Sequence, residues 1–599
     1  MTTKLQRRGI HLPLPRDRDY RGLESALRPV PLPLGCALEN RPLTTESNES
    51  RVLFKTPLVF LQMILDSLGS KDLASFALVN RECRQLARSR QFSAVYIEIS
   101  PRSWDIVQLL CFERLERAKS DNGMVSFPTL GACIRSITVK VQDNFTGMPI
   151  QNPSLEHRLD SPQTRHASCE GYNERAIYNL HFELRKILCC RWTLPHLETL
   201  KWNLNYCFDK ELLMALARPS LRNLILFDVS VDEMPASIYP LPLHLRTVFV
   251  KARQTDIGGR TDRFCLTLLQ RCAPTIECLV WHGDVTINHS IDLHTKLPFP
   301  RLCSLYLRQA NPNNFILTSL LKSKKLRDLR IDFFRPINDS LRNFINTYGR
   351  IETLETFSFA TPPLTFLRAN NQLSNINFDS TRAGSGSFED SVVVLEILII
   401  SRFDNLTSLG IRFSKRRKDF PWTALKLIGR LTGLNQLLIS NDGGIFAPAT
   451  DHNVILTSLR PLKKLKRLVI EGDIYEPDTN YHRPDQYYTA TYAIGEDTFD
   501  PNMSEEEIWK AKSDTEAGKP YWELRHDSKM KSIATDYRKG FKQLEFLYMG
   551  RRVLFFPRKS GNPMAWIYSP PQSAVDFYTG EMFHMVPWDR LSDMWTSRL

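Results

Sequence analysis

A short apolar element recurs along most of this 599-residue chain and limits its fold more than any other feature. Each copy has an aliphatic or aromatic residue at positions i, i+3 and i+5. The copies begin at Ile134, Leu197, Leu221, Leu245, Ile276, Leu302, Leu326, Leu354, Leu373, Leu406, Leu434, Leu465 and Leu544. Thirteen recurrences with one internal spacing predict a strand that repeats in the same setting.

Amphipathic helices are predicted between these strands. Most successive copies lie 24 to 33 residues apart, close to the period of leucine-rich repeats. Cys265, Leu268, Leu269 and Cys272 share one helical face, as do the residues Leu341, Phe344, Ile345 and Tyr348. One strand and one helix per unit require a parallel sheet backed by helices. Helices are wider than the strand spacing, so we expect an α/β fold, an irregular leucine-rich-repeat horseshoe with its sheet inside.

Side-chain alternation predicts which strand residues face the inner, concave surface. If positions i+3 and i+5 enter the core, positions i+2, i+4 and i+6 lie on the inner face. Aromatic and arginine side chains are the best anchors for a bound protein. The predicted contacts for a target protein are Phe227, Phe249, Tyr306, Arg308, Arg330, Arg412 and Tyr548. The same face is predicted to carry Lys201, His282, Asp332 and Phe546. For each one, the alternative is a solvated sheet residue.

A second kind of segment precedes the repeats, between Thr56 and Phe92. Its sequence predicts three short helices, the first capped by Thr56, the others opened by Ser70 or Asp72 and by Asn80. A unit of about forty residues has too small an interior for all of its aliphatic side chains, so the surplus is expected to face a neighbour.

This segment resembles an F-box. The matching positions are Pro57, Phe60, Leu61, Ile64, Leu65, Leu68, Asp72, Leu73, Leu78, Val79, Arg81 and Arg84, while Thr56, Val59 and Cys83 depart from the family pattern. The resemblance implies docking on the S-phase-kinase-associated adaptor of cullin-RING ligases. The predicted adaptor contacts are Pro57, Leu61, Ile64, Leu65, Leu68, Leu73, Leu78 and Val79. The alternative is an ordinary three-helix piece of core.

Together, the two regions resemble an F-box protein of the leucine-rich-repeat class, although the asparagine ladder of such repeats is missing. That resemblance implies the substrate-recognition subunit of an SCF ubiquitin ligase, with the adaptor, the cullin scaffold and an unknown protein substrate as partners. The chain itself is not expected to be an enzyme or to bind a cofactor or metal. It contains no nucleophile elbow, P-loop, dinucleotide glycine pattern or zinc-protease motif.

The predicted organisation has four parts. Residues 1–50 form a disordered leader rich in Pro and Arg, and residues 51–92 form the F-box. Residues 93–550 form the solenoid, with insertions near 142–168 and 472–529, and residues 551–599 form a C-terminal cap.

Composition limits the setting. Twelve scattered cysteines without metal spacing indicate reduced thiols, and no apolar run is long enough to cross a bilayer. These features predict a cytoplasmic or nuclear protein without membrane partners.

A net charge of +14 leaves an alternative open, a non-enzymatic basic scaffold that binds nucleic acid or acidic nuclear proteins. Its candidate cations are Lys324, Lys325, Arg327, Lys463, Lys464, Lys466 and Arg467. Lys415 to Lys418 is in addition a candidate nuclear-import signal. A solvated ridge is the simpler reading of the candidate cations, and we do not expect nucleic acid to be the main partner.

Overall fold

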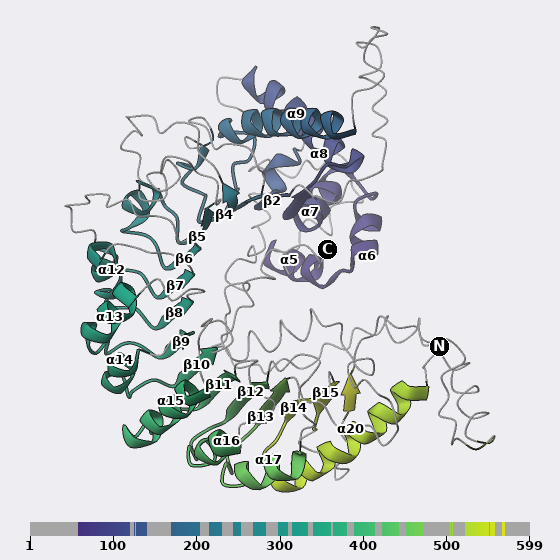
Figure 1. Ribbon diagram of the computed structural model, residues 1–599. Helices are drawn as coiled ribbons and strands as arrows, with labels where there is room; N and C mark the ends of the chain where they lie inside the picture. The colour runs from purple at the N-terminus through teal and green to yellow at the C-terminus, as the bar shows by residue number, and fades with distance from the viewer. Residues whose placement is uncertain are drawn as a thin grey trace. The chain divides into compact units, whose positions relative to one another are not determined.

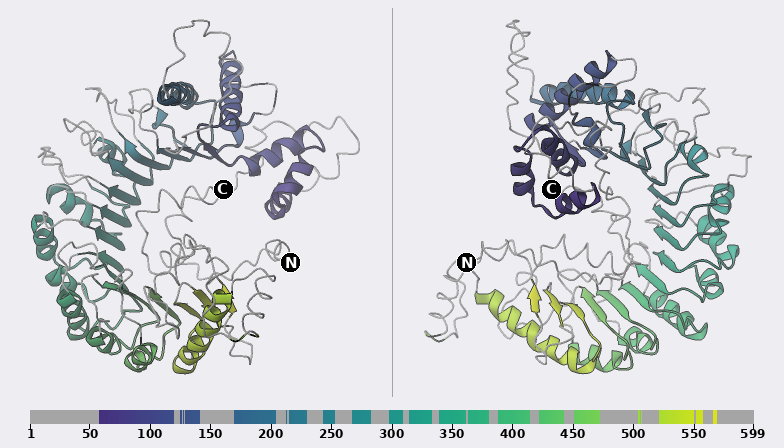
Figure 2. Two further views of the ribbon diagram at one scale, coloured as in Figure 1. Left: turned by 45° about the vertical axis from the view of Figure 1, so that its right-hand side comes forward. Right: turned by 180° about the vertical axis from the view of Figure 1, so that it is seen from behind.

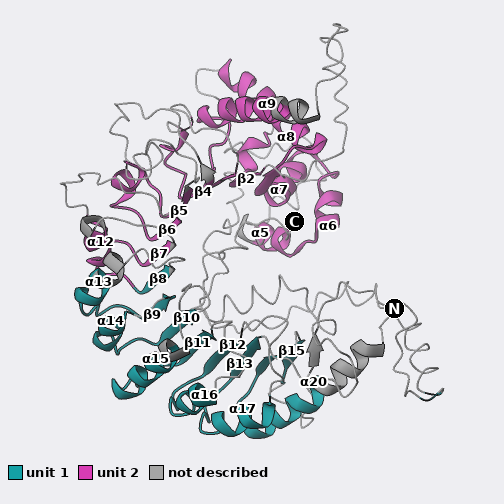
Figure 3. Cartoon of the chain, in the orientation of Figure 1, with its two compact units in different colours: residues 1–26, 327–599 teal, residues 27–326 magenta. Residues whose placement is uncertain are grey.

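The fold was analysed in a computed structural model. It describes residues 58–119, 125, 127, 129–140, 169–203, 212, 215–229, 243–252, 267–282, 298–308, 314–332, 339–360, 363–379, 388–413, 422–441, 451–471, 504, 506, 521–549, 552–556 and 566–568. The chain divides into two compact units (Figure 3). We call residues 27–326, magenta and labelled unit 2 in the figure, the first unit, and residues 1–26 and 327–599, teal and labelled unit 1, the second unit.

Three short helices open the described part of the first unit. They are α5 (Leu58–Ser67), α6 (Ser70–Phe76) and α7 (Arg81–Gln91). The predicted cap at Asn80 is confirmed, since its side chain accepts a hydrogen bond from the amide of Cys83 at 2.7 Å. Glu82 in the first turn and Arg88 and Arg90 in the last suit the dipole of α7. The predicted cap at Thr56 lies outside the described residues.

A parallel sheet follows these helices in the same unit. Its strands are β1 (Ala94–Ile97), β2 (Ser136–Lys140), β3 (Thr199–Asn203), β4 (Asn223–Val229), β5 (Thr247–Ala252), β6 (Cys278–His282) and β7 (Ser304–Arg308). Each strand pairs with the next one along the chain, always in parallel. The connecting helical segments are α8 (Pro101–Ala118), the 3-10 turn η2 (Gly131–Cys133), α9 (Cys169–Cys189) and α12 (Asn314–Leu321).

The second unit repeats the same pattern. Its parallel strands are β8 (Asp328–Asp332), β9 (Thr356–Phe359), β10 (Asn375–Asp379), β11 (Ser408–Phe413), β12 (Gln436–Asn441), β13 (Arg467–Glu471) and β14 (Phe546–Met549). Its helices are α13 (Asp339–Tyr348), α14 (Leu364–Ala369), α15 (Phe388–Ile400), α16 (Trp422–Ile428), α17 (His452–Leu459) and α20 (Tyr521–Gly540). Within this unit the helices lie on one side of the strands (Figures 1 and 2).

The thirteen predicted strands are confirmed as β2 to β14. Each begins two residues after the first apolar residue of its copy, so Ser136 follows Ile134 and Phe546 follows Leu544. Positions i+3 stay in register within each unit, as Leu224 opposite Val248 and Leu409 opposite Leu437 show. These side chains are buried, and the predicted α/β fold of parallel strands backed by helices is therefore confirmed.

The predicted helix faces are confirmed where their residues are described. Residues 267–272 are helical, and Leu268, Leu269 and Cys272 are buried. On α13, Ile345 is buried and Phe344 and Tyr348 are half-buried.

The predicted leader at residues 1–50 and the insertion at 142–168 lie outside the described residues. The second insertion was predicted to reach residue 529, but α20 already begins at Tyr521. After β14, β15 (Arg552–Phe555) and β16 (Trp566–Tyr568) add two antiparallel strands, so the free edge of β14 is paired. The C-terminal cap otherwise stays a prediction.

Candidate functional site

The three F-box helices are held together by a small apolar core. The buried members of this cluster are Leu61, Leu65, Leu73, Leu86 and Ala87, and Leu68, Phe76 and Ala77 pack against it half-buried. Leu61, Leu65 and Leu68 have the i, i+4, i+7 spacing of one helical stripe, so α5 turns this stripe inward. The three helices therefore bury these side chains among themselves.

This packing changes the predicted adaptor contacts. Leu65 exposes only 1% of its surface, and Leu61 and Leu73 are also buried. They are packing residues of the cluster, because a side chain whose surface is already covered has nothing left to offer a partner. Leu68 contributes mainly to the same cluster, and Pro57 lies outside the described residues.

Other apolar side chains of the F-box do face solvent. Ile64 exposes 47% of its surface, Leu78 79% and Val79 67%. Phe60 and Met63 on α5 are exposed as well, although neither is among the predicted contact residues. Positions 60, 63 and 64 have the i, i+3, i+4 spacing of one helix face, which lies beside the buried stripe. Five large apolar side chains exposed on one small domain indicate an interaction surface. We call these five residues the F-box apolar surface.

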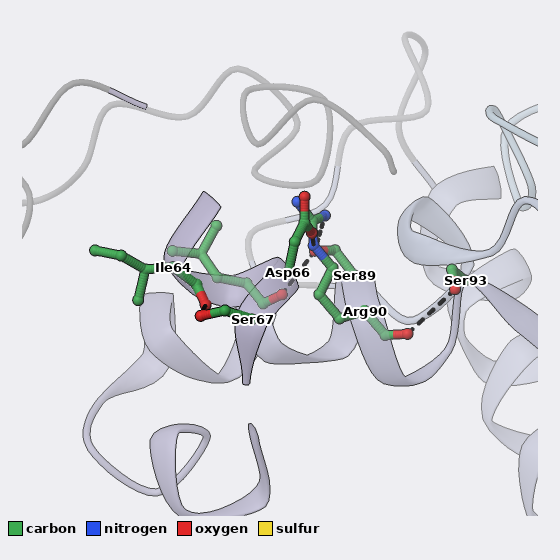
Figure 4. A network of polar contacts seen from close by, with 7 residues as sticks. Ile64, Asp66, Ser67, Ser89, Arg90 and Ser93 are labelled. Carbon is green, nitrogen blue, oxygen red and sulfur yellow. Dashed lines mark hydrogen bonds and ion pairs between the residues drawn. The ribbon is translucent and has the colours of Figure 1, made fainter. Parts of the chain in front are cut away.

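A polar network fixes the orientation of α5 relative to α7 (Figure 4). The Arg90 guanidinium, itself largely buried, forms an ion pair with the Asp66 carboxylate at 2.7 Å. Arg90 also donates to Ser89 Oγ at 3.1 Å, and its carbonyl accepts from Ser93 Oγ at 3.1 Å. Ser67 Oγ donates to the Ile64 carbonyl at 2.7 Å near the end of α5. These contacts hold the last turn of α5, which carries the exposed side chain of Ile64.

The turn between α6 and α7 presents the other two apolar residues. Backbone amides of Leu78 and Val79 donate to the carbonyls of Ser75 and Phe76 at 3.1 and 3.2 Å. Arg84 Nε donates to the Ala77 carbonyl at 3.4 Å from the first turns of α7. Because these bonds satisfy the backbone, the two side chains are left to point outward without a local structural cost.

Helix α7 also packs against the start of the repeats. Cys83, in the place of the tryptophan of the family pattern, is fully buried, and burial raises the pKa of its thiol. Gln85 Nε2 donates to the carbonyl of Thr129 at 2.8 Å. Glu113 of α8 accepts hydrogen bonds from the amides of Leu130 and Gly131, the latter at 2.9 Å. Burial raises the pKa of this carboxyl despite both bonds.

In the first unit, the inner strand face differs from the prediction in its exposure. Phe249 and Tyr306 belong to one row of the sheet, with Val280 between them in register, and all three are buried. Phe227 is half-buried and packs on Phe249, with ring centroids 4.8 Å apart. Neighbouring strands are close enough for large side chains of one row to cover each other. Lys201 and His282 are half-buried, and the side chain of Arg308 lies outside the described residues.

In the second unit, Arg412 keeps a partly exposed position on this face. Its guanidinium lies 3.6 Å from Asp379 and 3.2 Å from Glu471, carboxylates of β10 and β13. Arg330 is buried instead, 3.4 Å from the Asp328 carboxylate of its own strand.

The last strands of this unit form an apolar cluster on the same face. Tyr548 and Phe546 are buried there with Leu438 and Val469, and Phe555 packs against them. Among the predicted target contacts with described side chains, Phe249, Tyr306, Arg330 and Tyr548 are therefore sheet-packing residues, and Phe227 and Arg412 remain partly accessible. The side chain of Asp332 lies outside the described residues.

The basic residues of the alternative hypothesis are mostly solvated. Lys324, Lys325, Lys463, Lys464 and Lys466 are exposed, as is Arg327, which lies 3.7 Å from Glu355. Arg467 is buried instead and donates to Gln436 Oε1 at 3.2 Å. Lys415 to Lys418 lie outside the described residues.

Within the described ranges, no group of three or more His, Cys, Asp or Glu residues could hold a metal ion. Of the helices described, none has the length and apolar character that a membrane span requires.

The chain combines a compact cluster of three helices, which carries an apolar surface, with a parallel sheet backed by helices. This combination defines a modular binding protein. A model of the F-box domain matches residues 57–94. Those residues are thus an F-box domain, which is followed by a repeating parallel sheet backed by helices. No curated protein matches the sequence. Among solved structures, an internalin from Listeria monocytogenes is similar at 12% identity, with 75% of this chain and 94% of the internalin covered and a TM-score of 0.25.

Proposed function

We propose that this protein is the substrate-recognition subunit of an SCF ubiquitin ligase. The observation that carries the proposal is the F-box apolar surface: five apolar side chains of α5 and of the α6–α7 turn face solvent, although the helices already have a core of their own. F-box domains bind the S-phase-kinase-associated adaptor, and this surface supplies the contact. The cullin scaffold joins through the adaptor, and ubiquitin transfer is catalysed by other subunits in the cytoplasm or nucleus.

The adaptor contact centres on Ile64, Leu78 and Val79, together with Phe60 and Met63. Leu78 has the most to gain because about four-fifths of its surface is open. Fully burying a leucine side chain is worth roughly 1.5–3 kcal/mol. Leu61, Leu65 and Leu73 act indirectly, by holding α5 and the α6–α7 turn in place. The half-buried Leu68, which directly follows α5, extends the contact, and Pro57 remains a predicted contact.

The repeat sheets bind the target protein. Arg412 and Phe227 are the anchors we assign to it, since each is partly accessible on the inner face of its unit. Phe249 and Tyr306 stiffen the inner face of the first unit, and Arg330 and Tyr548 stiffen that of the second, while Arg308 of β7 remains a predicted contact of the target. Arginine and aromatic side chains on a rigid support are well suited to recognise a protein surface.

The test is the affinity of the full-length chain for the purified adaptor, measured by isothermal titration calorimetry. Leu78→Asp puts a charge into the proposed contact and should weaken binding at least thirtyfold, about 2 kcal/mol. Ile400→Asp on α15 is the matched control, because Ile400 is equally exposed but outside the F-box. No binding by the unaltered chain, or equal binding by both variants, would reject the proposal.

A cellular measurement tests the wider assembly. The tagged full-length chain should retain the adaptor and the cullin together, and the Leu78→Asp variant should lose both at once. Retention of the cullin by that variant would contradict an assembly that runs through the F-box.

A further inference from the structure

A second exposed apolar stripe lies outside the F-box, on helix α8. Leu109, Phe112 and Leu115 expose 37%, 49% and 52% of their surfaces. They are spaced i, i+3, i+6 on a helix whose other side is buried through Val107, Leu110 and other residues. Phe127 stacks on Phe112, with ring centroids 5.8 Å apart, but Leu109, Phe112 and Leu115 each keep a large part of their surface exposed. Three adjacent apolar side chains on one regular helix indicate a docking surface.

The residues around this stripe are arranged symmetrically about Phe112. With 3.6 residues per turn, Leu109 and Leu115 lie about 60° to either side of Phe112 and one turn away in opposite directions. Gln108 and Glu116 lie four residues before and after Phe112, on the same side of the helix as the stripe.

Charge follows the same symmetry. Asp105 and Lys119 lie seven residues before and after Phe112, so both fall within about 20° of its direction. Both are exposed, and Lys119 also pairs with Glu116 one turn earlier. The face thus has an acidic end and a basic end with an apolar centre.

We propose that this face binds the same face of a second copy of the chain, with the two α8 helices antiparallel about a two-fold axis at Phe112. A two-fold contact matches each residue with the residue equally far on the other side of the centre. Leu109 then meets Leu115 of the other copy, and Asp105 meets Lys119 at both ends. The antiparallel helix dipoles also attract each other.

Charge complementarity is what selects a second copy over another partner. A purely apolar face would fit many proteins. In this face, each residue that we can pair across the two-fold axis meets a complementary residue of the second copy. Gln108 can donate its amide to Glu116 of the other copy, which completes the pairing between the apolar centre and the charged ends. The inference concerns α8 alone and does not depend on the function proposed for the F-box.

The first experiment is sedimentation velocity of the full-length chain over a range of concentrations. The mass should rise from 69.3 kDa toward twice that value. Leu115→Glu should raise the dimer dissociation constant at least tenfold, because it buries two carboxylates at the centre. Ile400→Glu on the exposed end of α15 is the matched control and should dimerise normally. A chain that is monomeric at every concentration, or a Leu115→Glu variant that still dimerises, overturns the proposal.

The second experiment tests the orientation. Lys119→Asp places an acid against Asp105 of the other copy at both ends and should weaken the dimer about fivefold at low salt. Adding Asp105→Lys reverses both charges and should restore the affinity. Circular dichroism checks that each variant keeps its helices. A double variant as weak as Lys119→Asp alone would show that the two charges do not meet and would exclude the antiparallel pairing.

Discussion

Leu65 and Ile64 are neighbours in α5 with opposite surroundings, and replacing each by alanine should separate folding from binding. Leu65 is buried in the core of the F-box, whereas 47% of Ile64 faces solvent. Leu65→Ala should therefore destabilise the domain, and Ile64→Ala should weaken its contact with the adaptor. Both remove aliphatic carbons from the same helix, so each serves as the control for the other.

For Leu65→Ala, the expected loss is about 3 kcal/mol, typical of a leucine removed from a packed core. Unfolding of a chain with several parts is not a single transition, so a global midpoint would hide this local effect. Hydrogen exchange of residues 58–91 measures it directly. Their amides should exchange on the order of a hundredfold faster in Leu65→Ala, while the strands β8 to β14 keep their protection.

For Ile64→Ala, the expected effect on stability is within about 0.5 kcal/mol, since half of the side chain already lies in water. The effect on binding is larger. Fully burying an isoleucine is worth about 2.5 kcal/mol, so covering its exposed half is worth about 1.2 kcal/mol, close to eightfold in adaptor affinity. Isothermal titration calorimetry resolves a change of that size.

Two results would refute this reasoning. The first is fast exchange across α5 to α7 in Ile64→Ala, because an exposed side chain should not hold the cluster together. The second is a loss of adaptor affinity in Leu65→Ala with unchanged exchange, because Leu65 would then contact the adaptor directly.

Three further substitutions test other parts of the structure. Asn80→Ala removes the cap of α7 and should cost about 1 kcal/mol, visible as faster exchange at the start of that helix. Burial raises the pKa of Glu113, so the folded chain holds this proton more tightly than the unfolded chain. The unaltered protein should therefore gain stability relative to Glu113→Gln as the pH falls from 7 toward 4.5, as urea unfolding at several pH values can show. Arg412→Met should lower the stability of β10 to β13 by less than about 1 kcal/mol, as measured by hydrogen exchange, because the ion pairs of Arg412 with Asp379 and Glu471 are partly solvated. The affinity for the target protein should fall by more than that.

The strands of this protein could be predicted because their signal is local and repeated. Ile137 and Val139 differ in kind from Leu468 and Ile470, yet both pairs occupy positions i+3 and i+5 and both are buried. A parallel ladder requires each unit to place the same two positions in the core, so the sequence must repeat them. The segments between the strands carry no such constraint, and α20 starts where an insertion was expected.

The side that each F-box residue faces could not be predicted as well. Family matching groups Leu61, Ile64, Leu65 and Leu78 together as aliphatic positions, but it does not say which of them fill the interior. That depends on how α5 turns against α7, which the pair between Arg90 and Asp66 helps to fix. The two residues are 24 positions apart in sequence, and neither the period of α5 nor that of α7 reveals the contact.

Exposure on the inner sheet face has a similar explanation. Alternation correctly places Phe249 and Tyr306 on one face, because it follows from the backbone of each strand. Their burial depends on the neighbours in the same row, including Val280, and therefore on which strands are adjacent. A polar residue in the place of Val280 would leave the same alternation with a more open row. Accessibility is thus a property of the assembled sheet and not of any one strand.

Helix α7 connects the two activities that we propose. One side of it, with Leu86 and Ala87, completes the F-box core, and on the other Gln85 is buried and donates to the carbonyl of Thr129 at the start of the repeats. A helix shared in this way cannot turn without disturbing both partners. The F-box apolar surface is therefore held rigidly relative to the first repeats of its unit. For a subunit that acts by bringing a target close to a ubiquitin-carrying enzyme, such rigidity is useful, because a flexible link would spread the target over a larger volume and lower its effective concentration.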